Sequence, residues 1–207
     1  MCIIIMKGCA LNMVKKIPLI GIDDGGFQLF NPQWRSVHVF GVIMRGHHYT
    51  EKIVKTTILK DDPDPTSKII AMIRRSGHLQ NLKAILHKGI TIGGFGVIDP
   101  TRIVDELHLP FVAILTREPD FNAIRNALAN LDDGDDRWKT ITKHGNPMKI
   151  KDGLWIQVSG CDSDMAREWV LHSTVVGHVP EPLRLAHMIG KAIYEEDLLA
   201  DLSLEVS

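Results

Sequence analysis

Two carboxylates at the end of a predicted strand could bind a hard cation. Asp23 and Asp24 close the apolar run of residues 17–23 and precede Gly25 and Gly26. An acidic pair at a strand terminus faces solvent, where carboxylate oxygens can hold Mg²⁺. The alternative is a turn in which the aspartates cap backbone N–H groups and the glycines adopt positive φ. Spacing alone leaves both interpretations open.

Three further carboxylates, Asp61, Asp62 and Asp64, precede a predicted helix. Helix capping needs only one of them. The other two are either spare charge in a solvated loop or part of a binding site. Residues 132–136 form another acidic run, and there we expect a solvated loop.

A basic pair near the C-terminus could bind phosphate. Arg184 and His187 are three residues apart in a helix predicted for residues 182–194, so they share a face. Such a face can bind phosphate or support a metal site, although a single helical histidine is as often structural. The glycine-rich segment 89–96 lacks the Gly-Lys-Ser/Thr of a phosphate loop, and it indicates tight packing or a close approach by a ligand.

Composition excludes several classes of protein. The sequence has no Gly-x-Ser-x-Gly elbow, and its three cysteines have no C-x-x-C spacing, which argues against a zinc site. So few cysteines favour a reduced, cytoplasmic setting. The formal net charge of −1 argues against a general nucleic-acid coating protein. An enzyme with a local basic rim remains compatible with it.

The elements that must position these residues predict a mixed α/β fold. Short polar turns join the strands predicted at 17–23, 34–45 and 50–59, which indicates antiparallel neighbours. Strands and helices then alternate. The further strands are at 82–86, 111–115 and 154–158, and the helices are at 64–73, 100–107, 121–131, 162–173 and 182–194. This order predicts a mixed sheet with helices on both faces, and right-handed crossovers bring Asp23 near His87, Lys88 and Gly89.

The length of 207 residues fits one domain over residues 13–207. The apolar run near the N-terminus is too short for a signal peptide or a membrane span. We expect residues 1–12 to be an extension outside the core.

Four stretches together resemble an archaeal family of unknown function that is sometimes labelled endonuclease dU. They are IGIDDG at 20–25, MRG at 44–46, GITIGGF at 89–95 and PEPLRLAH at 180–187. The resemblance runs from about residue 13 to residue 194. That family is similar to endonuclease V, which implies a ribonuclease H-like fold. It also implies a DNA-repair type of activity, in which Mg²⁺ or Mn²⁺ supports cleavage of a strand near a deaminated base.

The resemblance also implies roles for individual residues. The metal ligands it implies are Asp23, Asp64 and His187, with Asp62 as an alternative second acid. Under the nuclease hypothesis, His187 or Asp99 assists the metal that Asp23 and Asp64 hold. Under the nuclease hypothesis, the residues that contact DNA or RNA phosphates are Arg45, Arg117 and Arg184.

Lys88 departs from the family pattern, which has Leu-Asp-Gly-Ile where this sequence has His87-Lys88-Gly89-Ile90. An ammonium cannot ligate Mg²⁺. We therefore expect Lys88 to form an ion pair with Asp23 or to replace one metal ion as a catalytic electrophile. The proline-aromatic wedge of endonuclease V is also missing, because residues 60–63 contain no aromatic side chain.

Three hypotheses follow. The first is a metal-dependent endonuclease, and the second is a catalytically impaired, nuclease-like protein that binds nucleic acid or nucleotides. A cation shared by Asp23 and Asp64 would favour the first, and a Lys88 ion pair would favour the second. The third is a small-molecule enzyme or interaction domain on the same fold. A pocket around Asp23 too narrow for a nucleotide would favour it.

Overall fold

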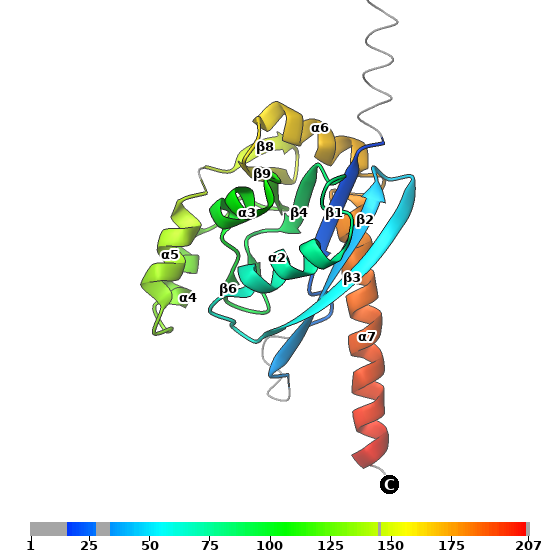
Figure 1. The fold of residues 1–207 in the computed structure, drawn as a ribbon. Helices are drawn as coiled ribbons and strands as arrows, with labels where there is room; N and C mark the ends of the chain where they lie inside the picture. Colours follow the sequence, from blue (N-terminus) through cyan, green and yellow to red (C-terminus); the bar gives the residue numbers. More distant parts are fainter. Residues whose placement is uncertain (1–15, 28–33, 145, 206–207) are drawn as a thin grey trace, which may run out of the picture.

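The computed structural model describes residues 16–27, 34–144 and 146–205, so the predicted extension 1–12 lies outside the described residues (Figure 1). A seven-stranded sheet has the order β3-β2-β1-β4-β7-β9-β8. Its strands are β1 (Pro18–Asp23), β2 (Ser36–Arg45), β3 (Tyr49–Leu59), β4 (Ala84–Lys88), β7 (Phe111–Leu115), β8 (Met148–Lys151) and β9 (Leu154–Ser159). A small hairpin of β5 (Thr91–Ile92) and β6 (Gly96–Val97) lies apart from this sheet.

The centre of the sheet is parallel and buried on both faces. Strands β1, β4 and β7 run in the same direction, and their short apolar runs suit a position between two layers of helix. Ile22 pairs with His87, so Asp23 and Lys88 end neighbouring strands, as the right-handed crossover predicts. Strands β2 and β3 add antiparallel to β1 as expected. Strand β9 runs antiparallel to β7.

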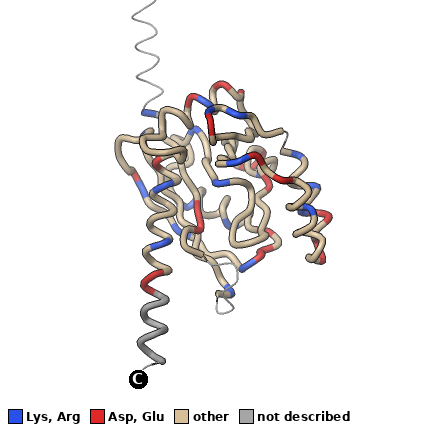
Figure 2. Tube along the Cα trace, turned by 180° about the vertical axis from the view of Figure 1, so that it is seen from behind, with Lys and Arg blue, Asp and Glu red and all other residues tan. Residues whose placement is uncertain are grey.

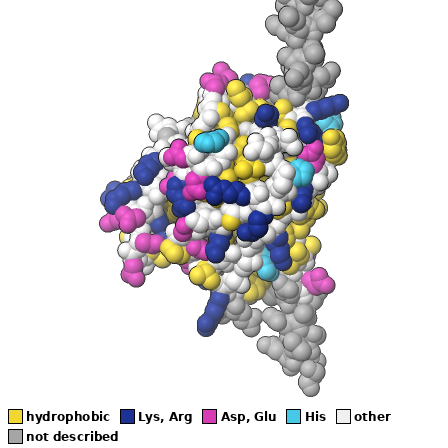
Figure 3. Space-filling model, viewed as in Figure 1, with side chains coloured by type: hydrophobic (Ala, Val, Ile, Leu, Met, Phe, Trp, Pro, Cys, Tyr) yellow, Lys and Arg dark blue, Asp and Glu magenta, His cyan; other side chains and the backbone are white. Residues whose placement is uncertain are grey.

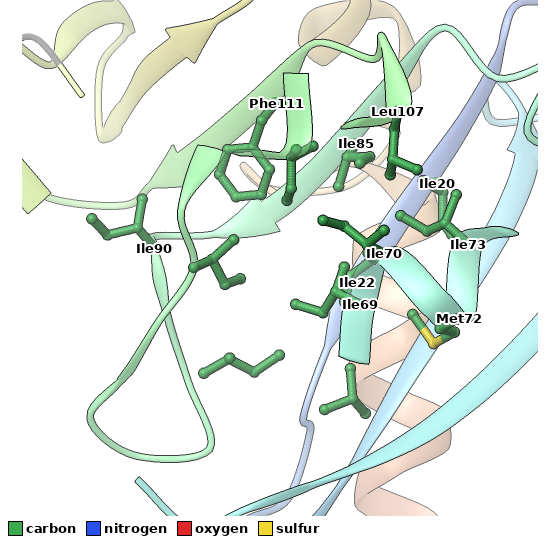
Figure 4. Packing of buried hydrophobic residues seen from close by; sticks show 14 of the residues in the cluster. Ile20, Ile22, Ile69, Ile70, Met72, Ile73, Ile85, Ile90, Leu107 and Phe111 are labelled. Atoms are coloured by element: carbon green, nitrogen blue, oxygen red, sulfur yellow. The ribbon is translucent and has the colours of Figure 1, made fainter. Parts of the chain in front are cut away.

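Helices cover both faces of the sheet, which confirms the predicted fold class (Figure 1). On one face lie α2 (Pro65–Arg75) and α3 (Pro100–Leu107). Ile69, Ile70 and Ile73 of α2 share one helical face and pack into the same core cluster as Ile20 and Ile85 (Figure 4). Each side chain buried in this way stabilises the fold by about 1.5–3 kcal/mol relative to an exposed one.

The opposite face is covered by α6 (Ser163–Ser173) and α7 (Glu181–Glu205). The longer helix, α7, packs against β1 and β2 and continues past them (Figure 1). It is longer than the predicted 182–194, because apolar residues recur at helical spacing beyond Tyr194, at Leu198, Leu199 and Leu202. No helix in the described part of the chain is long and apolar enough to cross a membrane.

Residues 132–136 do not form the solvated loop that we predicted. The helix α4 (Phe121–Leu128) ends early, and α5 (Gly134–Thr142) begins inside the acidic run. Asp133 is the N-cap residue, and Asp135 and Asp136 lie in the first turn, where acidic side chains interact favourably with the helix dipole. The run is therefore a helix start, and the strand β8 that follows was also not predicted.

Candidate functional site

The two aspartates that end β1 point to opposite faces of the sheet, since side chains alternate along a strand. Asp23 faces α7, and its Oδ2 lies 2.8 Å from His187 Nδ1. Asp24 turns the other way, where its Oδ2 accepts a 2.7 Å hydrogen bond from the backbone N–H of Gly93. Asp23 is only 5% exposed, so the expectation that both carboxylates face solvent is wrong for it. The helix α7 covers it.

Glycines let α7 come close enough to place His187 on Asp23. A Cβ atom at Gly21 would overlap the backbone of Leu183, and one at Gly25 would overlap the carbonyl of His187 itself. Only glycine permits so close an approach of a helix to a strand end. The IGIDDG and PEPLRLAH stretches are thus the two sides of one contact. The His187 side chain is still 50% exposed, so the ring reaches solvent.

Two pKa values are raised near the end of β1, those of His187 and Asp24. The hydrogen bond to Asp23 is the largest cause that raises the pKa of His187, although partial burial and the charge of Lys88 oppose it. Burial is the largest cause that raises the pKa of Asp24, and the neighbouring Asp23 charge adds to it. The end of β1 is therefore a compact group of interacting charges.

Lys88 lies on the same face of the sheet as Asp23, because their strands are in register and Lys88 acts electrostatically on His187. Within the described residues, however, no ion pair joins Lys88 to Asp23 or to any other acid. The ion pair that we considered is not formed, since His187 occupies the Asp23 carboxylate. The Lys88 side chain is exposed instead.

A cavity of about 580 Å³ opens where β4 and β7 end. Lys88 and Arg117 line it with the hydroxyl side chains of Thr91 and Thr116. Its apolar walls come from Ile90, Phe121, Ile124 and Ile141. Binding crevices of open α/β sheets lie at this edge, and the volume suits a nucleotide-sized ligand. Asp23 itself does not line this cavity.

Asp64 belongs to a different cluster. It is the N-cap of α2, where its carboxylate accepts hydrogen bonds from the Ser67 backbone N–H at 3.1 Å and from the Ser67 hydroxyl at 2.5 Å. Arg102 Nη1 adds an ion pair at 2.8 Å. Burial alone would raise the pKa of Asp64, but the Ser67 and Arg102 contacts together outweigh it and the pKa is lowered. Asp99 lies in the same cluster and caps α3 by accepting from the Arg102 backbone N–H.

The other two acids before α2 bind the backbone. Asp61 accepts a 2.7 Å hydrogen bond from the Phe95 N–H, and Asp62 accepts one of 3.0 Å from the Leu59 N–H. The guanidinium of Arg137 donates to the carbonyl oxygens of Asp61 and Phe95. All three carboxylates of the segment therefore have structural partners, and none is spare charge.

The three expected metal ligands thus fall into two clusters. The structure brings Asp23 and His187 together, and it ties Asp64 to Arg102 and Ser67. Among the described residues, no three His, Cys, Asp or Glu side chains form a group that could hold a metal ion. The positive charge of Lys88 beside Asp23 also disfavours a cation there. The described donors do not fit a resident ion, and the requirement for Mg²⁺ or Mn²⁺ stays a prediction.

The three candidate phosphate ligands are also separated. Arg117 lines the cavity and has no acidic partner among the residues that the structure describes. Arg45 pairs with Glu51 at 2.6 Å, and its register partner is Pro18, at the opposite end of β1 from Asp23. Arg184 is bound by both carboxylate oxygens of Glu181. Of these three arginines, only Arg117 lies at the edge of the sheet that carries the cavity and has no acidic partner among the described residues.

Charge elsewhere on the molecule is mixed. Figure 3 shows basic and acidic side chains interspersed on the face of α2 and α3, where Arg74 and Arg102 both pair with Glu106. Figure 2 shows basic and acidic positions spread along the described part of the trace rather than gathered in one region. A basic rim can therefore only be local, as the net charge predicts.

Sequence reasoning missed Gln157 and the apolar walls of the cavity. Gln157 is 5% exposed, lies beside Ala113 in the register of β9 and β7, and lines the cavity. A glutamine inside the apolar run LWIQV was the available signal, because a buried amide in a central strand needs partners. Phe121 and Ile124 lie in the helix predicted at 121–131, and periodicity alone does not show that they line a cavity.

Known proteins resemble this chain over most of its length. It is 34% identical to the UPF0215 protein of Methanosarcina mazei over 183 residues, which covers 86% of this chain and 91% of that protein. A Pyrococcus horikoshii UPF0215 protein is 36% identical over 181 residues, covering 86% and 93%. A crystal structure of a protein of unknown function from Archaeoglobus fulgidus superposes with a TM-score of 0.79 at 34% identity, covering 86% of this chain and 98% of that one.

More distant structures show the fold. The catalytic domain of human endonuclease V gives a TM-score of 0.54 at 12% identity, covering 88% of this chain and 84% of that one. Endonuclease V of Ciona intestinalis, in complex with DNA containing an inosine followed by a ribo-adenosine, gives 0.52 at 11% identity, covering 93% and 98%. The chain therefore has the ribonuclease H-like fold of endonuclease V, as the resemblance implied. The model of the family described as Endonuclease dU matches residues 15–194, and this chain belongs to that family.

Proposed function

We propose that this protein is an endonuclease that binds DNA or RNA along the sheet edge where β1, β4 and β7 end, and that it cleaves a phosphodiester bond beside Asp23. One observation carries the proposal: the Asp23–His187 pair, at 2.8 Å, lies beside Lys88, which with Arg117 lines a cavity and has no acidic partner among the described residues. Membership of the Endonuclease dU family supports it, as does the fold shared with endonuclease V.

Each residue of the edge has a role in this proposal. Asp23 engages His187 Nδ1, which leaves Nε2 of the half-exposed ring to take a proton from the attacking water or hydroxyl. The attacking oxygen forms a bond to phosphorus as the bond from phosphorus to the departing sugar oxygen breaks, and that oxygen takes a proton from solvent water. Lys88 and Arg117 position the phosphate from the cavity side. Asp64 keeps α2 in place from a distance and does not touch the substrate.

The proposed substrate carries a deaminated base in an accessible strand. The cavity combines apolar walls with the buried amide of Gln157, a combination that suits a nucleobase edge and face. Because residues 60–63 offer no aromatic wedge, the protein lacks that device for opening a duplex. The free energy needed to unpair and unstack the target base is lowest in a single strand. We therefore expect single strands to be cleaved faster than duplexes.

The test is cleavage of labelled DNA and RNA oligonucleotides that contain uracil, hypoxanthine or no lesion. Each is incubated in EDTA, in Mg²⁺ and in Mn²⁺ with the wild type and with Asp23→Ala. Cleavage that the wild type performs and Asp23→Ala loses would support the proposal. Cleavage that survives Asp23→Ala would contradict it, because the reaction would then not use this site.

The second candidate is a nuclease-like protein that binds nucleic acid without cleaving it. The observation that favours it is Lys88, which stands where the family pattern has an aspartate, in a site whose described donors fit no resident ion. A Lys88→Asp variant separates the two candidates. If the wild type binds but never cleaves, and Lys88→Asp cleaves in Mg²⁺, the second candidate is correct.

A further inference from the structure

Lys88 is an exposed cation at the end of β4, next to Asp23 in the sheet. It ends β4 beside Asp23, yet Asp23 is bound to His187 and no described acid pairs with Lys88. Three arginines of the described part of the chain are already neutralised by acids: Arg45 by Glu51, Arg102 by Asp64 and Arg184 by Glu181. The Lys88 ammonium is therefore available for an anion from outside the chain.

Arg117 adds a second available cation to the same cavity. It follows β7, whose Ile114 is the register partner of Lys88, so both residues line the cavity where neighbouring parallel strands end. Two acids, Glu118 and Asp120, also line the cavity. The Asp120 carboxylate caps α4 by accepting from the Ala123 N–H. An anion in this cavity would meet a lysine and an arginine.

From this arrangement we infer that Lys88 takes the place of a divalent cation and, with Arg117, holds a phosphate group of DNA or RNA directly. This inference rests on the proposed function and deepens it, because it names what the site uses to bind phosphate. An ammonium forms charge-assisted hydrogen bonds to phosphate oxygens, as a guanidinium does. Mg²⁺ would need several oxygen ligands here and would be repelled by Lys88. Binding should therefore not depend on a divalent cation.

The experiment measures the affinity of fluorescent single-stranded DNA and RNA 12-mers by anisotropy. Each titration is done in EDTA and in Mg²⁺ at constant ionic strength, with wild type, Lys88→Asp and Lys83→Asp. Lys83→Asp is the matched control, because Lys83 is exposed at the opposite end of β4 and the charge change is the same. A lost charge-assisted contact weakens binding by about tenfold or more.

The inference predicts equal wild-type affinity in EDTA and in Mg²⁺. Lys88→Asp should lose about tenfold in EDTA and recover in Mg²⁺, because the new carboxylate joins Asp23 as a metal ligand, while Lys83→Asp should stay within about twofold. Isothermal titration with Mn²⁺ alone should show binding to Lys88→Asp and not to the wild type.

Two results would overturn the inference and leave the proposed function intact. One is wild-type binding that requires Mg²⁺, and the other is binding in EDTA that Lys88→Asp leaves unchanged. If the wild type binds neither oligonucleotide in either condition, the proposed function fails and the inference fails with it.

Discussion

Two aspartates that the family resemblance places in one metal site have different surroundings in the folded chain. Asp23 is buried at the end of a strand and its carboxylate is bound by a half-exposed histidine, with an unpaired lysine on the same face. Asp64 is about half exposed, caps a helix and is held by Ser67 and Arg102. Both are carboxylates that precede glycine- or proline-rich turns in the sequence.

The difference between Asp23 and Asp64 shows how a carboxylate of a functional site can be distinguished from one that only stabilises the fold. The hydrogen bonds of Asp64 fix a helix terminus and an interhelical contact, so its charge is already used within the fold. Asp23 orients a ring that reaches solvent beside a cavity with free cations. A carboxylate that lies beside cations without acidic partners is the better candidate for a catalytic role.

The largest expected effect compares cleavage by two matched variants. Asp23→Asn removes the charge that orients His187, and we expect the cleavage rate to fall by about a hundredfold or more, the range found when a general base is lost or misplaced. Asp64→Asn should change the rate by less than about threefold, since a neutral cap is retained. Single-turnover assays on the preferred oligonucleotide measure both. Equal losses would mean that the two acids act in one site after all.

The next largest effect is a difference in oligonucleotide affinity between the variants Arg117→Gln and Arg45→Gln. Arg117→Gln removes a free cation from the cavity, and we expect about a tenfold loss of oligonucleotide affinity and a shallower salt dependence. Arg45→Gln breaks an ion pair with Glu51 at the other end of the sheet, and affinity should hardly change. Anisotropy over a range of salt concentrations tests this. A loss caused by Arg45→Gln would place the nucleic acid elsewhere.

Stability should reveal the structural role of Asp64. Asp64→Ala removes the cap of α2, and the free energy of unfolding should fall by about 1 kcal/mol. The exposed ion pair with Arg102 adds little to that. Because the folded pKa of Asp64 is lowered, this stability is present above the ordinary aspartate pKa and is lost as pH falls through the folded value. Urea unfolding of the wild type and Asp64→Ala at about pH 7 and about pH 2 should show a difference in the free energy of unfolding only at the higher pH.

The smallest expected effect is on the titration of His187. The hydrogen bond to Asp23 raises its pKa, so Asp23→Asn should lower it and Asp64→Asn should leave it unchanged. The raised pKa means that the pair stabilises the fold below the ordinary histidine pKa and loses this contribution as pH rises through the folded value. Proton–nitrogen NMR of the imidazole ring follows the titration. An unchanged pKa in Asp23→Asn would show that the pair is not formed in solution.

Much of this comparison could be predicted from local sequence patterns. The apolar runs around Ile20, Ile85 and Val112 identify the central strands, because a strand buried on both faces must be continuously apolar. The spacing of Ile69, Ile70 and Ile73 identifies α2. The helix at 134–142 was missed because its start is an acidic run with a glycine, and such a run reads equally well as a loop.

By itself, the sequence determined that Asp23 ends a buried strand, that Lys88 ends its neighbour and that His187 lies on an amphipathic helix, because these facts depend on local periodicity and on one handedness rule. Only the tertiary structure decided that His187 reaches Asp23 while Asp64 turns to Arg102. Those contacts join residues far apart in the chain and depend on how closely α7 packs on the glycines of β1. Local pattern carries no information about which of several possible partners a buried charge will meet.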